Sequence, residues 1–529
     1  MLLYHLDGSV IERQPVSGTA PIPLYKEDGP RVGARGWAAL VVLMLPVLLV
    51  SVDNTVLAFA IPEISLALQP SGAQQLWIID IYSLVLAGLL VTMGVLGDRF
   101  GRRRMLLIGA TGFAVVSAFA AFAPTAGLLI AARAALGLFG AMLMPSTLSL
   151  LRSIFQNRDQ RRLAIAIWAS AFSAGSALGP IVGGFLLEHF AWGSVFLIAV
   201  PVLIPLLIGG FWLLPESSDP NPGQIDPIGI LLSMAALVPI VYAIKAFAVD
   251  GPSITASGLV VFGLVTGFLF VRRQQRAVIP MLDMSLFRRG GFSGAILVNL
   301  LSVVALVGFL YFVSQQLQLV IGLSPMVAGL ALVPGMAAMI IAGLSVVPVS
   351  RRVPPHIVVP LGLVLSALGY VLVAATAELN SVPWLLAAFV VLGLGIGAAE
   401  TISNELILAH APPEKAGAAS AVSETAYELG AVLGTAILGG IITAFYRGAL
   451  VIPDRVPAAS AEQARETLAG AYVVAHDLPQ ALGQSLWDAA TDAFGSGVVT
   501  TSIIGALLVA IAIAVAATTL RPSQNAVLR

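Results

Sequence analysis

The chain has 529 residues, of which 58% are hydrophobic and only 10% charged, a composition that excludes an ordinary water-soluble globular protein. Lys and Arg balance Asp and Glu at 27 each, so there is no basic surplus for nucleic acid, and the lack of cysteine excludes disulfides, zinc–thiolate centres and cysteine nucleophiles. The composition therefore predicts a protein that lies in a lipid bilayer.

Residues 1–36 are polar, contain four prolines and lack the basic-then-apolar pattern of a signal peptide, so we expect a tail there. The chain then runs through apolar stretches of about 18 to 25 residues, each long enough to cross the hydrocarbon layer. Fourteen spans are predicted, at 37–60, 76–97, 105–123, 127–151, 163–187, 193–214, 227–247, 254–271, 291–312, 325–348, 356–376, 383–409, 417–444 and 498–520.

These spans must be helices, because backbone groups in lipid have no water to bind and the stretches lack the alternation of barrel strands. The predicted fold class is an all-α integral membrane protein with fourteen transmembrane helices. With the first tail inside, 22 of the 27 basic residues fall in inside segments and three fall outside. Since Lys and Arg of short loops stay in the cytoplasm, both tails, 1–36 and 521–529, are predicted to be cytoplasmic.

The segment 445–497 lies outside, between the last two predicted spans, and is polar and rich in alanine. Two short amphipathic helices are predicted there, and Ser460-Ala-Glu-Gln463 has the pattern of a capping box at the start of one. Its acidic residues outnumber its basic residues by six to three, which could attract cations weakly. A solvated hairpin is the preferred interpretation.

Two pairs of similar motifs indicate an internal repeat. Gly175–Gly184 in the fifth span is similar to Gly430–Gly440 in the thirteenth, and the arginines of 101–104 correspond to those at 351–352. Secondary transporters are commonly built from such repeats, with the site at mid-membrane. We therefore predict two six-helix bundles plus two inserted helices: an N-terminal bundle at 37–214, a linker with the inserted helices at 215–290, and a C-terminal bundle at 291–520.

Carboxylates inside the spans are the strongest functional candidates, because an acid at bilayer depth is costly unless it pairs, is neutralised or faces water. Burial favours the protonated form of Asp53 in the first span, and a cation bound nearby would favour release of that proton. An interfacial Asp that caps a helix end is the alternative. Glu424 and Glu428 lie four residues apart on one helix face, where two like charges resist double ionisation. The alternative for Glu424 is a solvated residue near the cytoplasmic mouth.

Three further charged residues lie in or near spans. Asp80, near the outer edge of the second span, fits a cation vestibule and an interfacial residue of an aromatic belt equally well. Arg133, in the fourth span, needs a carboxylate partner, and Asp53 or a neighbour is the expected one. Lys245 lies within a few residues of the outer edge, so its long side chain is predicted to reach the surface.

Two motifs of the first half have structural interpretations as well as functional ones. Asp98 and the arginines of 99–104 form either a charged latch against a helix end on the cytoplasmic face or a plain basic turn. Gly175, Gly179, Gly183 and Gly184 allow close approach between helices, while Pro180 bends its helix.

Several of these motifs resemble those of the major facilitator superfamily, and within it the fourteen-span drug/proton antiporters of the QacA, SmvA and LfrA group. The resemblance covers residues 37–520 and rests on Asp53–Pro62, Gly94–Arg104, Leu129–Arg133 with Gly137 and Gly140, Gly175–Gly184, Gly322–Gly329 and Ser420–Gly430. It implies a cytoplasmic gate at Gly94, Asp98, Arg99, Gly101, Arg102 and Arg103, and an antiporter motif at Gly175, Gly179, Pro180, Gly183 and Gly184.

The resemblance implies a monomeric, proton-coupled exporter of a bacterial inner (cell) membrane, with proton coupling and cation binding at Asp53, Asp80, Glu424 and Glu428. Implied cargoes are lipophilic cations such as quaternary ammonium compounds, ethidium and acriflavine, with fluoroquinolones as a further class. Export of a lipid or lipid-like metabolite is one alternative, and a non-transporting membrane sensor or assembly factor is another. No Gly-Lys dipeptide, His-Glu-x-x-His or Gly-x-Ser-x-Gly occurs, so we predict no enzyme activity, no cofactor, no metal site and no nucleic-acid partner.

Overall fold

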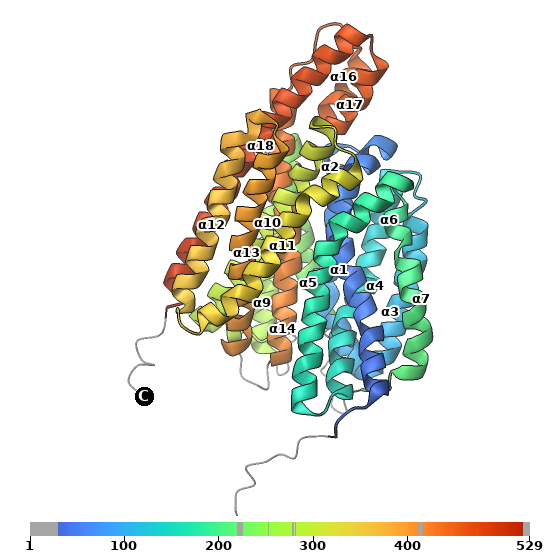
Figure 1. Cartoon of the computed structure of the whole chain (residues 1–529), viewed down its shortest axis with the longest axis vertical. Helices are drawn as coiled ribbons and strands as arrows, with labels where there is room; N and C mark the ends of the chain where they lie inside the picture. The colour runs from blue at the N-terminus through green and yellow to red at the C-terminus, as the bar shows by residue number, and fades with distance from the viewer. Residues whose placement is uncertain are drawn as a thin grey trace, which may run out of the picture.

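The structure is a computed structural model that describes residues 30–218, 226–251, 253–277, 280, 282–410 and 416–521. The predicted tails therefore lie mostly outside the described residues. Within these ranges the chain contains fourteen helices that are long and apolar enough to cross a membrane, and no strand (Figure 1). The predicted all-α membrane fold with fourteen spans is confirmed.

The helices of the first half and the insertion are α1 (Ala34–Leu68), α2 (Gly72–Phe100), α3 (Arg102–Ala120), α4 (Ala126–Ile154), α5 (Arg158–His189), α6 (Ser194–Leu197), α7 (Ala199–Leu213), α8 (Pro227–Asp250) and α9 (Ile254–Arg276). Those of the second half are η1 (Leu286–Arg288), α10 (Gly290–Gln315), η2 (Gln316–Val320), α11 (Pro325–Ser350), α12 (Pro355–Thr376), η3 (Ala377–Leu379), α13 (Val382–His410), α14 (Ala416–Gly434), η5 (Thr435–Gly439), α15 (Gly440–Ala449), α16 (Ala458–Glu466), α17 (Leu468–Asp477) and α18 (Gln480–Thr519).

Several helices are longer than their apolar segments. The helix α1 continues to Leu68 rather than residue 60, and α18 begins at Gln480 rather than residue 498. Hydropathy marks only the part of a helix that lies in hydrocarbon, whereas the hydrogen-bonded helix continues into the polar interface. Two spans also contain a wider π-helical turn, at η2 and η5, a feature that is frequent at functional sites.

The hairpin contains the two short predicted helices, α16 and α17, but the predicted capping box is wrong. Because Ala458 and Ala459 are strong helix formers, α16 begins at Ala458, and Ser460 lies inside its first turn. A capping box occurs instead at the start of α2. There the Ser71 hydroxyl accepts from the Gln74 backbone N–H at 3.2 Å, and the Gln74 side chain accepts from the Ser71 N–H at 3.1 Å.

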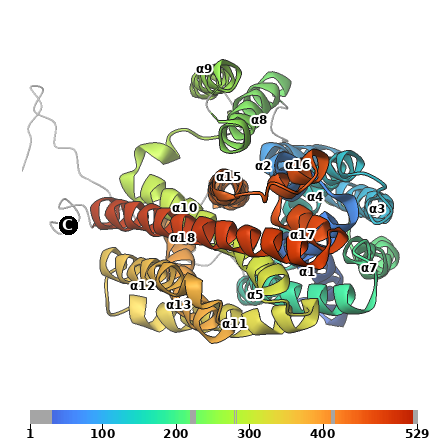
Figure 2. The same cartoon turned by 90° about the horizontal axis from the view of Figure 1, so that it is seen from above.

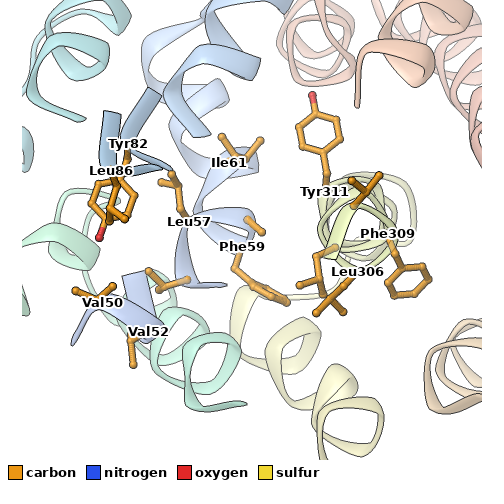
Figure 3. Close-up of a cluster of buried hydrophobic side chains, with 14 of the residues drawn as sticks. Val50, Val52, Leu57, Phe59, Ile61, Tyr82, Leu86, Leu306, Phe309 and Tyr311 are labelled. Carbon is orange, nitrogen blue, oxygen red and sulfur yellow. The ribbon is translucent and has the colours of Figure 1, made fainter. Parts of the chain in front are cut away.

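Close packing within the first bundle depends on small residues of α4. A Cβ atom at Gly137 would lie 2.5 Å from the Tyr82 carbonyl oxygen, and one at Gly140 would lie 3.1 Å from the Tyr82 hydroxyl. Figure 3 shows the resulting core, with Tyr82 beside the buried apolar residues of α1 and with α10 facing them from the second bundle. Helices in lipid associate through such packing, since the tails are as apolar as the side chains.

The inserted helices α8 and α9 lie at the edge of the molecule, where α8 contacts α2 and α15 (Figure 2). At one end of the pair, Asp226 caps α8 by accepting from the Gly229 N–H at 2.9 Å, and Arg273 of α9 donates to the same carboxylate at 2.7–2.9 Å. The hydrogen bonds from Arg273 hold the pKa of Asp226 below its usual range. The two inserted helices are thereby joined outside the apolar segments.

Candidate functional site

The glycines of the antiporter motif bring α5 against helices of both bundles. Cβ atoms at Gly175 and Gly179 would overlap the Ser51 and Thr55 hydroxyls of α1, and one at Gly184 would lie 2.7 Å from the Pro325 carbonyl of α11. The Thr55 hydroxyl also donates to the Ser176 carbonyl at 3.1 Å. The motif therefore lies at the helix crossing that carries Asp53 and at a contact between the bundles.

Gly179→Val is expected to disrupt this crossing, because the added atoms must displace Thr55. Overpacking of this kind costs about 1–3 kcal/mol, so we expect a lower thermal unfolding temperature of the purified protein and weaker export. Gly258→Ala on α9 is a matched control, because no atom lies within 4 Å of a Cβ there. Equal stability of the two variants would contradict close packing at the motif.

Asp53 and Arg133 form a buried ion pair in the middle of the first bundle. The Asp53 Oδ2 atom lies 2.7 Å from an Arg133 terminal nitrogen, and the two side chains are 9% and 2% exposed. Arg133 also donates to the Ile78 carbonyl at 3.2 Å and lies 4.5 Å above the centre of the Tyr82 ring. The structure thus gives Arg133 the expected carboxylate partner. Asp53 does not cap a helix end, because it lies inside α1.

Asp80 and Lys245 form a second buried pair, and here the sequence prediction is wrong. The Lys245 Nζ atom lies 2.9 Å from Asp80 Oδ2, and both side chains are 1% exposed. Lys245 does not reach the surface, because α8 packs on α2 and turns this side chain inward, where it donates to the Leu76 carbonyl at 3.1 Å. Asp80 is likewise buried, and its carboxylate faces Lys245.

Glu428 is buried without a basic partner. Its side chain lies against Ser83 of α2 and accepts a hydrogen bond from the Asn54 amide at 3.3 Å, although Asn54 belongs to the first bundle and Glu428 to the second. No Lys or Arg lies within 4.0 Å of it in the described ranges. Glu424, one turn earlier on α14, is only partly buried, and neither glutamate is among the residues that line the pocket described next.

A pocket between the bundles lies beside these groups. Its polar lining contains Asp80 and Arg133 together with hydroxyl and amide groups, and the rest is apolar or aromatic. The lining residues are Asn54, Thr55, Leu57, Ala58, Ile79, Asp80, Ser83, Arg133, Leu306, Val307, Leu310, Tyr311, Tyr427, Ala431 and Thr435. Apolar walls with a few convergent polar groups are typical of a small-molecule site, and aromatic faces also attract cations.

Contacts between the bundles gather between this pocket and the end of the molecule that carries the hairpin. There Gln75 donates to Gln315 at 3.4 Å and Gln318 donates to the Phe59 carbonyl at 3.1 Å. Glu466 of the hairpin accepts from the Gly72 N–H at 2.9 Å and pairs with Arg447 at 3.1 Å. These contacts hold the two bundles together at the hairpin end.

At the opposite, arginine-rich end, no hydrogen bond of the 98–104 loop reaches the second bundle within the described residues. Asp98 pairs with Arg102 at 2.8 Å, and the Arg103 backbone N–H donates to Glu216, just after α7, at 3.1 Å. A Cβ atom at Gly101, whose φ is +107°, would lie 2.7 Å from the Glu216 carboxylate. The charged cluster contacts a helix end, but that end belongs to its own bundle.

The remaining residues of the loop motif, Gly94 and Arg99, have ordinary packing or exposed positions. A Cβ atom at Gly94 would contact Pro145 at 3.5 Å, an ordinary packing distance. Arg99 is exposed in the last turn of α2. The structure therefore places these residues beside the Asp98 cluster and not in the pocket.

Sequence reasoning missed Lys245 as a site residue and the contacts of Asn54 and Ser83 with Glu428. It also missed Glu216 as the partner of the 98–104 loop. Asn54 directly follows Asp53, but an amide inside a span carries no charge signal. For Lys245 the available signal was its charge inside a predicted span. Its distance from the span edge favoured the wrong interpretation, because that distance does not show which helix covers the residue.

Comparison with known proteins places the chain in a family. Residues 43–435 match the family model described as Major Facilitator Superfamily. The chain is 56% identical to "Multidrug efflux pump LfrA" of Mycolicibacterium smegmatis over 92% of this chain and 96% of the relative. It is 37% identical to "Methyl viologen resistance protein SmvA" of Salmonella typhimurium over 90% of this chain and 97% of the relative.

A solved structure shares the fold. The inward-facing, unoccupied structure of a bacterial homolog to the human lysosomal transporter Spinster matches with a TM-score of 0.66 and 16% identity, over 93% of this chain and 100% of that chain. The family model and the two relatives confirm the resemblance found in the sequence motifs, and the protein is a multi-pass membrane transporter and not an enzyme. The chain belongs to the Major Facilitator Superfamily.

Proposed function

We propose that this protein is a proton-coupled multidrug efflux antiporter that exports lipophilic cations by alternating access. The observation that carries the proposal is Glu428, a buried carboxylate without a basic partner, beside a largely apolar pocket. A proton or a bound cation can neutralise this group, but one carboxylate does not need both. Competition between the two is the chemical basis of exchange.

The position of Glu428 couples this competition to conformation. Its hydrogen bond to Asn54 joins α14 of one bundle to α1 of the other, so a change in its charge acts directly on a contact between the bundles. A ligand shifts a two-state equilibrium only through different contacts in the two states. Glu428 provides such a difference, and the neighbouring Asp53–Arg133 pair adds charge to the same region.

We propose that the arginine-rich end is cytoplasmic and that the described arrangement accepts cargo from that side. The hydrogen bonds between the bundles lie near the pocket and the hairpin, whereas none from the 98–104 loop reaches the second bundle in the part of the chain that the structure describes. The basic residues at that end agree with the retention of Lys and Arg in the cytoplasm. Both termini would then be cytoplasmic in a bacterial inner membrane, with a monomer as the working unit. We also propose that the chain divides into an N-terminal bundle at 37–214, a linker with the inserted helices at 215–290 and a C-terminal bundle at 291–520.

The relatives support drug efflux as the activity. The names of the 56% and 37% identical relatives state multidrug efflux and methyl viologen resistance, and a 34% identical relative from Streptomyces glaucescens is a "Tetracenomycin C resistance and export protein". For this chain we propose quaternary ammonium compounds, ethidium and acriflavine as cargoes. A largely apolar pocket beside an acid without an ion pair suits such ligands.

The test is ethidium movement in proteoliposomes under an imposed pH gradient, with and without an uncoupler. We expect accumulation that requires the gradient and is lost when the uncoupler is added. Gradient-independent movement would contradict proton coupling. No movement by well-folded protein, together with movement of a fluorescent phospholipid, would replace cation export with the lipid alternative.

A further inference from the structure

Among the charged side chains that line the pocket or pair with its lining, acidic groups outnumber basic ones. Three carboxylates either line the pocket, as Asp80 does, or form a hydrogen bond or ion pair with a lining residue, as Asp53 and Glu428 do, and two bases, Arg133 and Lys245, accompany them. Each base pairs with one acid. With these five groups ionised, their charges sum to one net negative charge, at Glu428.

One of the two bases comes from outside the twelve helices that form the bundles. Lys245 is carried by the inserted helix α8, and its side chain reaches Asp80 of α2. Its Nζ atom lies 3.8 Å from the centre of the Trp77 ring and 3.1 Å from the Leu76 carbonyl. A carboxylate, a carbonyl oxygen and an aromatic face are the partners that a lipophilic ammonium ligand also prefers.

Asp80 is positioned between this ammonium group and the pocket. Asp80 lines the pocket, whereas Lys245 is not among the lining residues and approaches from α8. Thr435, in the wide turn η5, lies on the pocket side of Asp80. Asp80 therefore lies at the pocket wall while its charge is already neutralised by Lys245.

We propose that Lys245 is a tethered cation that determines the charge selectivity of the site. By occupying Asp80, it leaves Glu428 as the one unpaired acid of these three, so the site favours monocations over dications. The inference rests on the proposed cation-binding function and deepens it by assigning substrate specificity to the inserted helices. It makes Lys245 a specificity-determining residue that acts through Asp80 without contacting the cargo.

The test measures binding of two probes, the monocation ethidium and the dication methyl viologen, to the purified full chain without any gradient. We expect Lys245→Met to lower the Kd of methyl viologen at least tenfold, a change equivalent to about 1.4 kcal/mol. The Kd of ethidium should change much less. Lys245→Arg, which keeps the charge, is the matched control and should change neither. Equal changes for both probes, or no change, would overturn the proposal.

Two further variants separate selectivity from folding. Lys245→Met leaves Asp80 buried without its cation, which is destabilising in itself. The double variant Lys245→Met with Asp80→Asn should regain thermal stability but lose the increased affinity for methyl viologen. If the double variant still binds methyl viologen more tightly than the unaltered protein, Asp80 is not the group that binds the second positive charge of this dication. Asp80→Asn alone frees the charge of Lys245 and should weaken ethidium binding about tenfold or more, and unchanged affinity would also overturn the proposal.

The outcomes distinguish this inference from the proposed function. If the unaltered protein binds neither probe, the cation-export proposal itself fails. If it binds and transports ethidium but the Lys245 variants keep the same preference between the probes, only the role of Lys245 is refuted.

Discussion

Glu428→Gln is expected to abolish gradient-driven export while leaving the protein folded. The amide has nearly the shape of the carboxylate and can keep the contact with Asn54, but it can neither release a proton nor neutralise a cation. Among Asp53, Asp80 and Glu428, only Glu428 has no ion pair within the described residues, so neither of the two bases of the region already neutralises its charge. Ethidium uptake into proteoliposomes should fall to the rate of protein-free vesicles, with thermal stability unchanged or higher.

Glu424→Gln is the matched control for this variant. The residue has the same chemistry on the same helix, but it is only partly buried, and within the described residues no hydrogen bond joins it to the first bundle as Asn54 joins Glu428. We expect export to be reduced at most severalfold. If the two substitutions have equal effects, Glu424 and Glu428 act as one unit, as the sequence alone predicts, and Glu428 has no special role. Full activity of Glu428→Gln would remove it from the mechanism.

Asp53→Asn is expected to have the largest effect on stability. It leaves the Arg133 guanidinium buried without an anion, with only the Ile78 carbonyl and the Tyr82 ring as partners. Removal of one partner of a buried pair typically costs about 3–5 kcal/mol. We therefore expect a marked loss of thermal stability in detergent, in addition to loss of export.

A second variant separates the structural role of this pair from its functional role. Replacing Asp53 with Asn and Arg133 with Met together removes both charges, so most of the lost stability should return. Export should stay absent if the pair takes part in coupling. A stable double variant that exports ethidium at the normal rate would show that the pair only holds α1 and α4 together.

The fourteen spans and the family could be predicted from the sequence because both depend on local signals. A span is a run of apolar residues, and the motifs Gly94–Arg104 and Gly175–Gly184 are continuous in the chain. Helix ends were less accurate, as the early start of α18 shows, since a helix continues beyond the hydrocarbon without an apolar signal.

The site was predictable only in part, because its contacts join residues far apart in the chain. That Arg133 needs an acid follows from its depth, and the structure supplies Asp53, 80 residues away. That Lys245 faces Asp80 depends on which side of α8 packs on α2, and no pattern within residues 227–250 fixes that side. The partner of the arginine loop, Glu216, lies more than 100 residues further along the chain for the same reason.

The buried pair between α2 and α8 also limits how far the molecule can be divided into modules. An insertion between two repeats would ordinarily be removable, and a twelve-helix transporter would remain. Here the removal of α8 and α9 would leave Asp80 as an unpaired acid in lipid and would uncover the Trp77 side of α2. The inserted helices supply the ammonium group that neutralises a buried carboxylate. A shortened twelve-helix chain would therefore need a neutral residue at position 80.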